Sequence, residues 1–308
     1  MTEKTNPQTA DAQSWALLVI LAAIWGGSFM FIGVAVKELP SLLIVLARVS
    51  MAAAILLPIH IILIGKLPAD RKSWTACAGM SIMNNVIPFT LITWGQHHIA
   101  SGLASVINAT TPMFAAIFMA LAAYEAITLR KTIALLVGVA GVVILQGADF
   151  SNLGDQSLGI LAVIVAAAFY GLSAPWSKKM LTGIPPLTIA TCQLLISSVI
   201  MAAIVLPTQN IGLYAKASMQ TWAALIALAA LATSLAYLLF FRIIARAGAS
   251  FVSLVTMLVP VSAIGLGYLF LNETLSIHEI IGALVIGLSL VIIDGRALKF
   301  LGVKASPQ

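Results

Sequence analysis

Long apolar runs alternate with short polar connections along the whole chain. Ten runs each come close to the roughly 20 residues that a helix needs to cross a hydrocarbon core. They cover residues 15–36, 42–64, 73–95, 101–123, 129–147, 157–181, 187–206, 221–245, 249–271 and 277–295. Because lipid offers no hydrogen-bond partner to bare backbone, each run is predicted to be a membrane-spanning α-helix. The connections are short, so consecutive helices are expected to pack side by side in one bundle.

The composition supports a membrane class. Hydrophobic residues make up 61% of the chain and charged residues 8%, against about 45–50% and about 25% in soluble domains. The first apolar run is too long for the apolar core of a signal peptide and is followed by no convincing cleavage site, so it is predicted to be retained. Cys77 and Cys192 lie inside apolar runs, have no metal-type spacing, and are expected to pack.

The chain repeats itself. At an offset of 148, Trp74 aligns with Trp222, Pro112 with Pro260 and Glu125 with Glu273. Over the first two runs of each half the offset is 145, which aligns Trp25-Gly26 with Tyr170-Gly171 and Arg48 with Gln193. Five helices per half is an odd number, so the second half must enter from the opposite side of the membrane. The predicted fold is an all-α membrane protein of ten helices, formed by two inverted five-helix repeats around a central cavity.

The repeat also gives the expected domain boundaries. They are a cytoplasmic tail 1–14, a first repeat 15–148, a periplasmic linker 149–155, a second, inverted repeat 156–296 and a cytoplasmic tail 297–308.

The charge distribution predicts the orientation. With the N-terminus in the cytoplasm, thirteen of the 16 basic residues fall in inner segments, whereas only Lys37 and Lys216 fall outside and Arg48 lies within a span. The positive-inside rule therefore predicts a multi-pass protein of the inner (plasma) membrane with both termini in the cytoplasm. This explains the net charge of +6 without an anionic partner such as nucleic acid.

Several motifs occur in a specific order. They are Trp25-Gly26-Gly27-Ser28 in the first run, Asn84-Asn85 with Pro88-Phe89 and Trp94-Gly95-Gln96 in the third, and Asn108 to Pro112 in the fourth. Together with the duplication, they resemble the EamA branch of the drug/metabolite transporter superfamily over about residues 15–295. The resemblance implies a central cavity lined mainly by spans 1, 3, 4, 6, 8 and 9. It also implies export of amino acids or other metabolites.

Polar side chains inside the spans are the candidates for substrate binding, because amides and hydroxyls in lipid need partners. The candidates are Trp25, Ser28 and Phe29 on span 1, Asn84, Asn85 and Phe89 on span 3, Asn108 on span 4, Tyr170, Ser173 and Trp176 on span 6, Ser234 and Tyr237 on span 8, and Thr256 on span 9. The alternatives are helix-to-helix contacts for the small hydroxyl residues and interface anchoring for the tryptophans.

Four further residues are candidates for gating. Pro112 and Pro260 each free a carbonyl one turn upstream and predict matching kinks in the two halves, with a tolerated helix irregularity as the alternative. Pro88 is the third hinge candidate. Arg48 could contact a substrate carboxylate, pair with Glu38 or Glu273, or snorkel to the outer interface.

Two aligned glutamates, Glu125 and Glu273, stand at the ends of spans 4 and 9. They are interpreted as loop and cap residues, with a gating salt bridge as the alternative. Ser276 and Glu279 predict a capping box at the start of the last helix.

The leading functional hypothesis is export of a small metabolite, best a neutral or aromatic amino acid, by alternating access. A facilitator or exchanger is favoured, because no acidic residue lies at the centre of a span. The alternatives are proton-coupled efflux of drugs or lipophilic cations, and a receptor without transport. No phosphate loop, catalytic dyad, dinucleotide fingerprint or metal spacing is found, so no enzyme activity, cofactor or metal is predicted. The expected partners are the substrate and the lipid bilayer, and the chain is expected to act as a monomer.

Overall fold

The computed structural model describes residues 11–146 and 154–294, and this part of the chain is helical with no strand. The first half contains α1 (Ala12–Ala35), α2 (Ser41–Leu63), α3 (Arg71–Ser81), the π-helical segment η1 (Ile82–Val86), α4 (Ile87–Gly95), α5 (Ser101–Asn108), α6 (Thr111–Leu121) and α7 (Leu129–Gln146). The second half contains α8 (Asp155–Met180), α9 (Pro186–Thr208), the 3₁₀ segment η2 (Ile211–Lys216), α10 (Met219–Ala229), the π-helical segment η3 (Ala230–Leu235), α11 (Ala236–Ala247), α12 (Ala249–Val252), α13 (Val255–Leu271) and α14 (Ile277–Asp294).

The described residues contain eight helical stretches long and apolar enough to cross a membrane. Three of them are continuous through a change of helix type or a turn, namely Arg71–Gly95, Ser101–Leu121 and Met219–Ala247. Two further helices are not among the eight, namely α13, with 17 residues, and α7, with 18. The all-α membrane class is therefore confirmed, whereas ten spans and the inversion of the repeats stay predictions. The expected linker and both tails lie largely outside the described residues.

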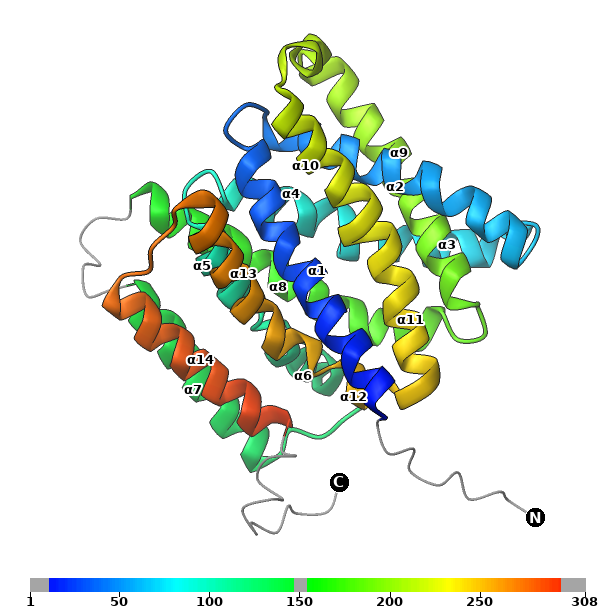
Figure 1. Cartoon of the computed structure of the whole chain (residues 1–308). Coiled ribbons are helices and arrows are strands. Elements are labelled where there is room, and N and C mark those ends of the chain that lie inside the picture. The colour runs from blue at the N-terminus through cyan, green and yellow to red at the C-terminus, as the bar shows by residue number, and fades with distance from the viewer. Residues whose placement is uncertain (1–10, 147–153, 295–308) are drawn as a thin grey trace, which may run out of the picture.

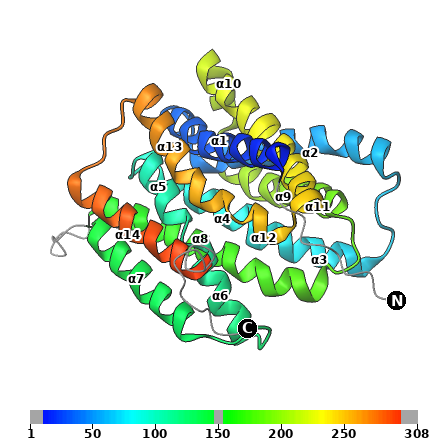
Figure 2. The same cartoon turned by 60° about the horizontal axis from the view of Figure 1, so that its bottom comes forward.

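The packing of the helices has a two-fold pattern. Helix α1 packs on α13, and its counterpart α8 packs on α6, while α2 pairs with its own counterpart α9 and α7 with α14. Figures 1 and 2 show α7 and α14 side by side at one edge of the bundle, away from α2 and α9. Exchange of the two halves thus maps most contacts onto one another, as expected for a duplicated unit.

Aligned glycines permit close approach at two of these contacts. A Cβ on Gly26 of α1 would lie 2.8 Å from the backbone nitrogen of Ala263, and a Cβ on Gly171 of α8 would lie 2.7 Å from that of Ala115. Both pairs are equivalent under the repeat offsets. A side chain at either glycine would push α1 away from α13 or α8 away from α6, so both glycines are needed for this packing.

The π-helical segments also occur at equivalent positions, 148 residues apart. In η1, Pro88 has no N–H, so the carbonyl of Asn84 cannot receive the usual bond from four residues later. In η3, the hydroxyls of Thr233 and Ser234 donate to the carbonyls of Leu228 and Ala229, at 2.8 and 2.9 Å. Such segments often mark functional sites in helices, and here both face the same cavity.

The helix interruptions near Pro112 and Pro260 do not lie at aligned positions, and the matching kinks stay a prediction. Between α5 and α6 the helix is interrupted at Ala109 and Thr110, next to Pro112 in the first turn of α6. In the second half the interruption lies before Val255, and α13 continues through Pro260. A proline at an aligned position therefore does not impose an aligned break, because a proline inside a helix can also be accommodated by its neighbours.

Candidate functional site

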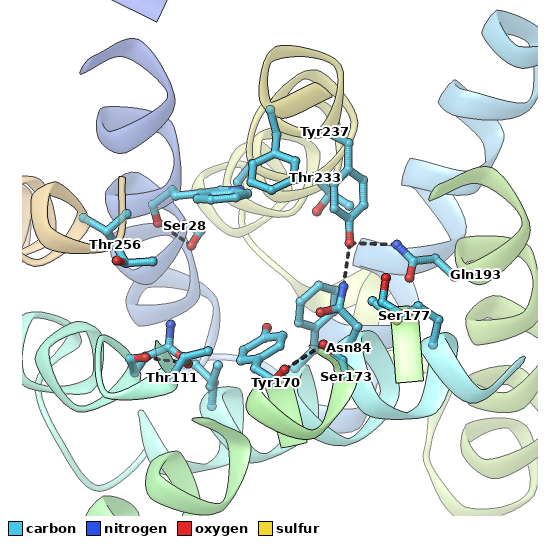
Figure 3. Close-up of a pocket in the computed structure, with 18 of the residues that line it drawn as sticks. Ser28, Asn84, Thr111, Tyr170, Ser173, Ser177, Gln193, Thr233, Tyr237 and Thr256 are labelled. Atoms are coloured by element: carbon cyan, nitrogen blue, oxygen red, sulfur yellow. Dashed lines mark hydrogen bonds between the residues drawn. The ribbon is translucent and has the colours of Figure 1, made fainter. Parts of the chain in front are cut away.

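A cavity of about 600 Å³ lies between the two halves, within the size range of small-molecule sites. It is lined by residues from α1 to α6, α8, α9, α11 and α13 and from both π-helical segments. Figure 3 shows Ser28 and Thr256 on one side of this space, Tyr237 and Gln193 on another, and Tyr170 below. The cavity is thus shared by both repeats, as a substrate site at their interface would be.

Most predicted substrate-binding residues line this cavity. They are Trp25, Ser28, Phe29, Asn84, Phe89, Asn108, Tyr170, Ser173, Tyr237 and Thr256. Some are matched across the repeats: the hydroxyls of Ser28 and Ser173 each donate 2.6 Å hydrogen bonds to the carbonyls of Trp25 and Tyr170, three residues upstream. Their contact with a substrate stays a prediction.

Three predicted residues do not line the cavity. Asn85 is buried and donates from Nδ2 to the hydroxyl of Ser197 at 3.1 Å. Ser234 bonds backbone carbonyls. The indole nitrogen of Trp176 donates to the carbonyl of Ala76 at 2.9 Å. These groups hold helices together, because each polar atom already has a protein partner.

The surroundings of Trp176 explain why it does not line the cavity. A Cβ on Gly79 of α3 would clash with the Trp176 indole ring. The glycine therefore provides the space that the ring fills between α8 and α3. A tryptophan near the end of a span is satisfied by packing of this kind as well as by a substrate.

Tyr237 is the centre of a polar network at one side of the cavity. Its hydroxyl donates to Oδ1 of Asn85 at 3.2 Å and accepts from Nε2 of Gln193 at 3.1 Å. The amide of Asn84 lies at the longer distance of 3.4 Å (Figure 3). The network joins α9, α11 and η1, so both halves position the phenol.

Arg48 is buried beside this network, with 7% of its surface exposed, and lines the cavity. Its Nε donates to the hydroxyl of Thr233 at 3.0 Å, and its guanidinium carbon lies 3.7 Å from the centre of the Phe89 ring. The predicted ion pairs with Glu38 and Glu273 are wrong, as is snorkelling. Glu38 accepts from the backbone of Ser218 and Glu273 from that of Ser101.

The charge of Arg48 has no acidic partner in the described part of the chain. A guanidinium has five N–H donors, and only Nε forms a hydrogen bond with these residues. The Phe89 ring compensates for part of the charge by a cation–π contact. The remaining donors are therefore available to a group that enters the cavity.

Two acceptor atoms of the lining are also without a partner among the described residues. They are Oδ1 of Asn108 and Oε1 of Gln193, both buried. A buried carbonyl oxygen without a donor costs free energy. Both atoms would accept from a bound water or from the N–H groups of a ligand.

Sequence reasoning did not select several lining residues. Gln193 and Thr233 line the cavity and align with Arg48 and Asn85 of the first half, but neither is among the predicted site residues. The other lining residues outside the prediction include Thr111, Ser177, Phe240 and Phe241. The usable signal was alignment to a chosen residue in the other half, which would have found Gln193 and Thr233. The aromatic pair carries no such signal, because Phe is common throughout apolar spans.

A second cavity of about 590 Å³ adjoins the first and shares Ala174 and Thr256 with it. Its other lining residues come from α6, α13, α14 and the connections after α6 and before α13, and include Pro112 and Glu125. It lies toward the end of the bundle that carries the α6–α7 connection. In the predicted topology this is the cytoplasmic side.

Comparisons with known proteins agree with this architecture. A family model described as the EamA-like transporter family matches twice, over residues 13–146 and 157–294. A solved crystal structure with 16% sequence identity has a TM-score of 0.65, covering 94% of this chain and 99% of the other, which shows a shared fold.

Curated relatives match over most of their length. The uncharacterized transporter YoaV of Bacillus subtilis is 26% identical, with 87% of this chain and 92% of YoaV covered. The uncharacterized transporter YvbV of the same organism is also 26% identical, with 96% and 94% covered. A WAT1-related chloroplastic protein of Arabidopsis thaliana is 26% identical, with 88% and 67% covered. With two matches to one family model and transporters as its relatives, the chain belongs to the EamA-like transporter family, within the drug/metabolite transporter superfamily, and is a multi-pass membrane transporter of small molecules.

Proposed function

We propose that this transporter exports a metabolite that carries a carboxylate and an N–H donor, best a neutral or aromatic amino acid, by alternating access. Arg48 is the observation that carries the proposal. An ionisable side chain within a membrane span is costly and marks a functional site by default. This one is buried, lines the cavity and has no acidic partner among the described residues. A substrate carboxylate would supply the missing partner.

The other end of such a substrate has suitable acceptors. An ammonium group has three donors and no acceptor, and Oδ1 of Asn108 and Oε1 of Gln193 are buried acceptors without a donor. The lining between these groups includes Trp25, Phe89 and Phe240, against which an apolar or aromatic side chain would pack. The set of groups therefore suits a zwitterion with an apolar body.

Exchange or facilitated diffusion suits the lining better than proton coupling. No Asp or Glu is among the described residues that line the main cavity, and proton-coupled pathways use titratable groups at membrane depth. We place the protein in the inner membrane as a monomer with both termini in the cytoplasm, on the basis of the positive-inside rule. Efflux of lipophilic cations is the second candidate, and Arg48 opposes it by charge repulsion.

Flux measured in proteoliposomes tests the proposal. Vesicles that contain purified protein would be preloaded with one unlabelled amino acid at a time, and uptake of the same labelled amino acid would be followed with and without a proton gradient. We expect saturable counterflow that needs no gradient. Saturable transport of a permanent lipophilic cation, with no counterflow of any amino acid, would contradict the proposal.

A further inference from the structure

Glu273 joins the two halves of the protein at one end of the bundle. It follows α13, and its carboxylate accepts three hydrogen bonds from the start of α5, which belongs to the other half. Oε1 accepts from the backbone N–H of Ser101 at 2.9 Å, and Oε2 accepts from the Ser101 hydroxyl at 2.6 Å and the Gly102 N–H at 3.2 Å. The first N–H groups of a helix have no partner within it, so the carboxylate acts as their cap.

The backbone turns sharply to bring Glu273 to this position. Asn272 adopts a left-handed conformation with φ 55°, which ends α13. The N–H of Glu273 then donates to the carbonyl of Gly267 at 3.1 Å. Left-handed residues are usual at such helix ends, and Asn tolerates the conformation better than most.

Two glycines let the neighbouring helices converge on the carboxylate. A Cβ on Gly267 of α13 would lie 2.5 Å from Oε2 of Glu273 and 3.0 Å from the Ser101 hydroxyl. A Cβ on Gly33 of α1 would lie 2.7 Å from Cδ1 of Leu271 at the end of α13, and at the ordinary contact distance of 3.9 Å from Oε1 of Glu273. The ends of α1, α5 and α13 therefore meet around Glu273, and all three helices line the main cavity. The contacts of Glu273 thus join the two halves at this end of the bundle.

The aligned glutamate at the opposite end behaves differently. Glu125 follows α6, and its carboxylate accepts from the ammonium of Lys131 at 2.7 Å, within its own connection. Its side chain is 45% exposed. Instead of closing the bundle, it lines the second cavity, which meets the main one at Ala174 and Thr256. The aligned glutamate thus ties the two halves together at one end of the bundle and bonds only its own connection at the other.

We propose that the Glu273 carboxylate is the latch of the outer gate, and that its three hydrogen bonds to the start of α5 must break before the main cavity opens to the outside. This rests on the alternating access proposed above. The charge of the carboxylate is essential, because bonds to a charged acceptor are stronger than neutral ones. Ser101 contributes both an N–H and a hydroxyl, so its side chain accounts for one of the three bonds.

Labelling of a reporter cysteine tests the latch without any substrate. Ser105 lines the cavity one turn inside the start of α5. The reporter variant would carry Ser105→Cys, with Cys77→Ala and Cys192→Ala to remove other thiols. Intact cells would be treated with a membrane-impermeant thiol reagent, and the labelling rate would be compared with and without Glu273→Gln. Because labelling needs no transport, a failed flux assay leaves this test valid.

We expect Glu273→Gln to raise the labelling rate about tenfold or more, the effect of losing one charge-assisted interaction. The matched control is Glu125→Gln, which changes the aligned residue and should leave the rate unchanged. An unchanged rate in Glu273→Gln, or an equal rise in Glu125→Gln, would overturn the proposal. If Glu273→Gln does not reach the membrane, Ser101→Ala replaces it, with a smaller rise expected, and an unchanged rate again overturns the latch.

Discussion

The two halves present aligned pairs of side chains to the same cavity, but with different chemistry. In the first half, Arg48 of α2 stacks on Phe89 of α4. In the second half, the aligned residues Gln193 of α9 and Tyr237 of α11 form a hydrogen bond of 3.1 Å. The same two aligned positions therefore contact each other in both halves. They hold a cation and an aromatic ring in the first half, and an amide and a phenol in the second. A cavity built this way can bind an asymmetric molecule in one orientation.

The largest expected effect comes from making the two sides alike. Arg48→Gln would give the first half the residue that the second half has, and would remove the cation that we assign to the carboxylate. Hydrogen bonds to charged groups are worth about 1.5–3 kcal/mol, so KM for the transported amino acid should rise about tenfold or more. The KM is measured from the concentration dependence of counterflow in proteoliposomes.

Arg48→Lys is the matched control for this variant. It retains the charge but loses the planar group that stacks on Phe89 and donates to Thr233, so an intermediate KM is expected. If Arg48→Gln transported as well as the unaltered protein, the difference between the halves would not concern the substrate.

A second comparison sets Asn108 against its aligned residue Thr256. Oδ1 of Asn108 is buried without a donor in the described residues, whereas the Thr256 hydroxyl donates to the carbonyl of Ser253 at 2.8 Å. Asn108→Ala should therefore raise KM about fivefold, for a hydrogen bond worth about 1 kcal/mol. Thr256→Ala should change KM less. Equal effects in the two variants would mean that Asn108 does not bind substrate.

Trp176 aligns with Phe31, so Trp176→Phe again makes the halves alike. The variant loses the hydrogen bond from the indole nitrogen to Ala76, worth about 1 kcal/mol. We expect a lower Tm in detergent, measured by intrinsic fluorescence or a thiol-independent dye, and an unchanged KM. A raised KM at an unchanged Tm would instead mean that Trp176 contacts the substrate.

The smallest expected effect concerns the starts of α1 and α8. Asp11 caps α1 by accepting from Ser14 and pairs with Arg246, at 2.8 Å, whereas Gly154 offers α8 no side-chain cap. The bonds from Ser14 lower the pKa of Asp11 from 3.8 to about 2. A lowered pKa stabilises the fold above the unfolded value, and this contribution is lost as the pH falls from about 4 through about 2.

Asp11→Ala should therefore lower Tm slightly at neutral pH and by less near pH 2, where part of the charge contribution is already lost. Asp11→Asn, which retains a capping oxygen but loses the charge, should have a Tm between those of Asp11→Ala and the unaltered protein. An equal Tm decrease in Asp11→Ala at both pH values would mean that the carboxylate charge plays no part.

Much of the fold was predictable because membrane helices leave strong signals. Run length predicted the helices, and the duplication predicted which helices would be counterparts. The capping box was also predictable from Ser276 and Glu279, and it is confirmed by the bond of 2.7 Å from the Ser276 N–H to the Glu279 carboxylate.

The site was only partly predictable, because polarity in a span does not reveal a partner. Asn84 and Asn85 are neighbours in sequence, yet one lines the cavity and the other bonds Ser197. Adjacent residues of a helix point about 100° apart, and the sequence does not reveal which of the two faces the cavity. The capping of α5 by Glu273 of the other half was likewise not predictable from the sequence, because it joins residues 172 positions apart.

The role of Arg48 is tested most directly by removing the carboxylate from the substrate and not from the protein. The amino acid with the highest counterflow would be compared with its carboxamide and with the amine that lacks the carboxyl group, each as a competitor of labelled uptake. We predict that both analogues compete about tenfold or more weakly with the unaltered protein, and that Arg48→Gln abolishes this difference. Equal competition by the amine and the amino acid, in the unaltered protein, would contradict the account.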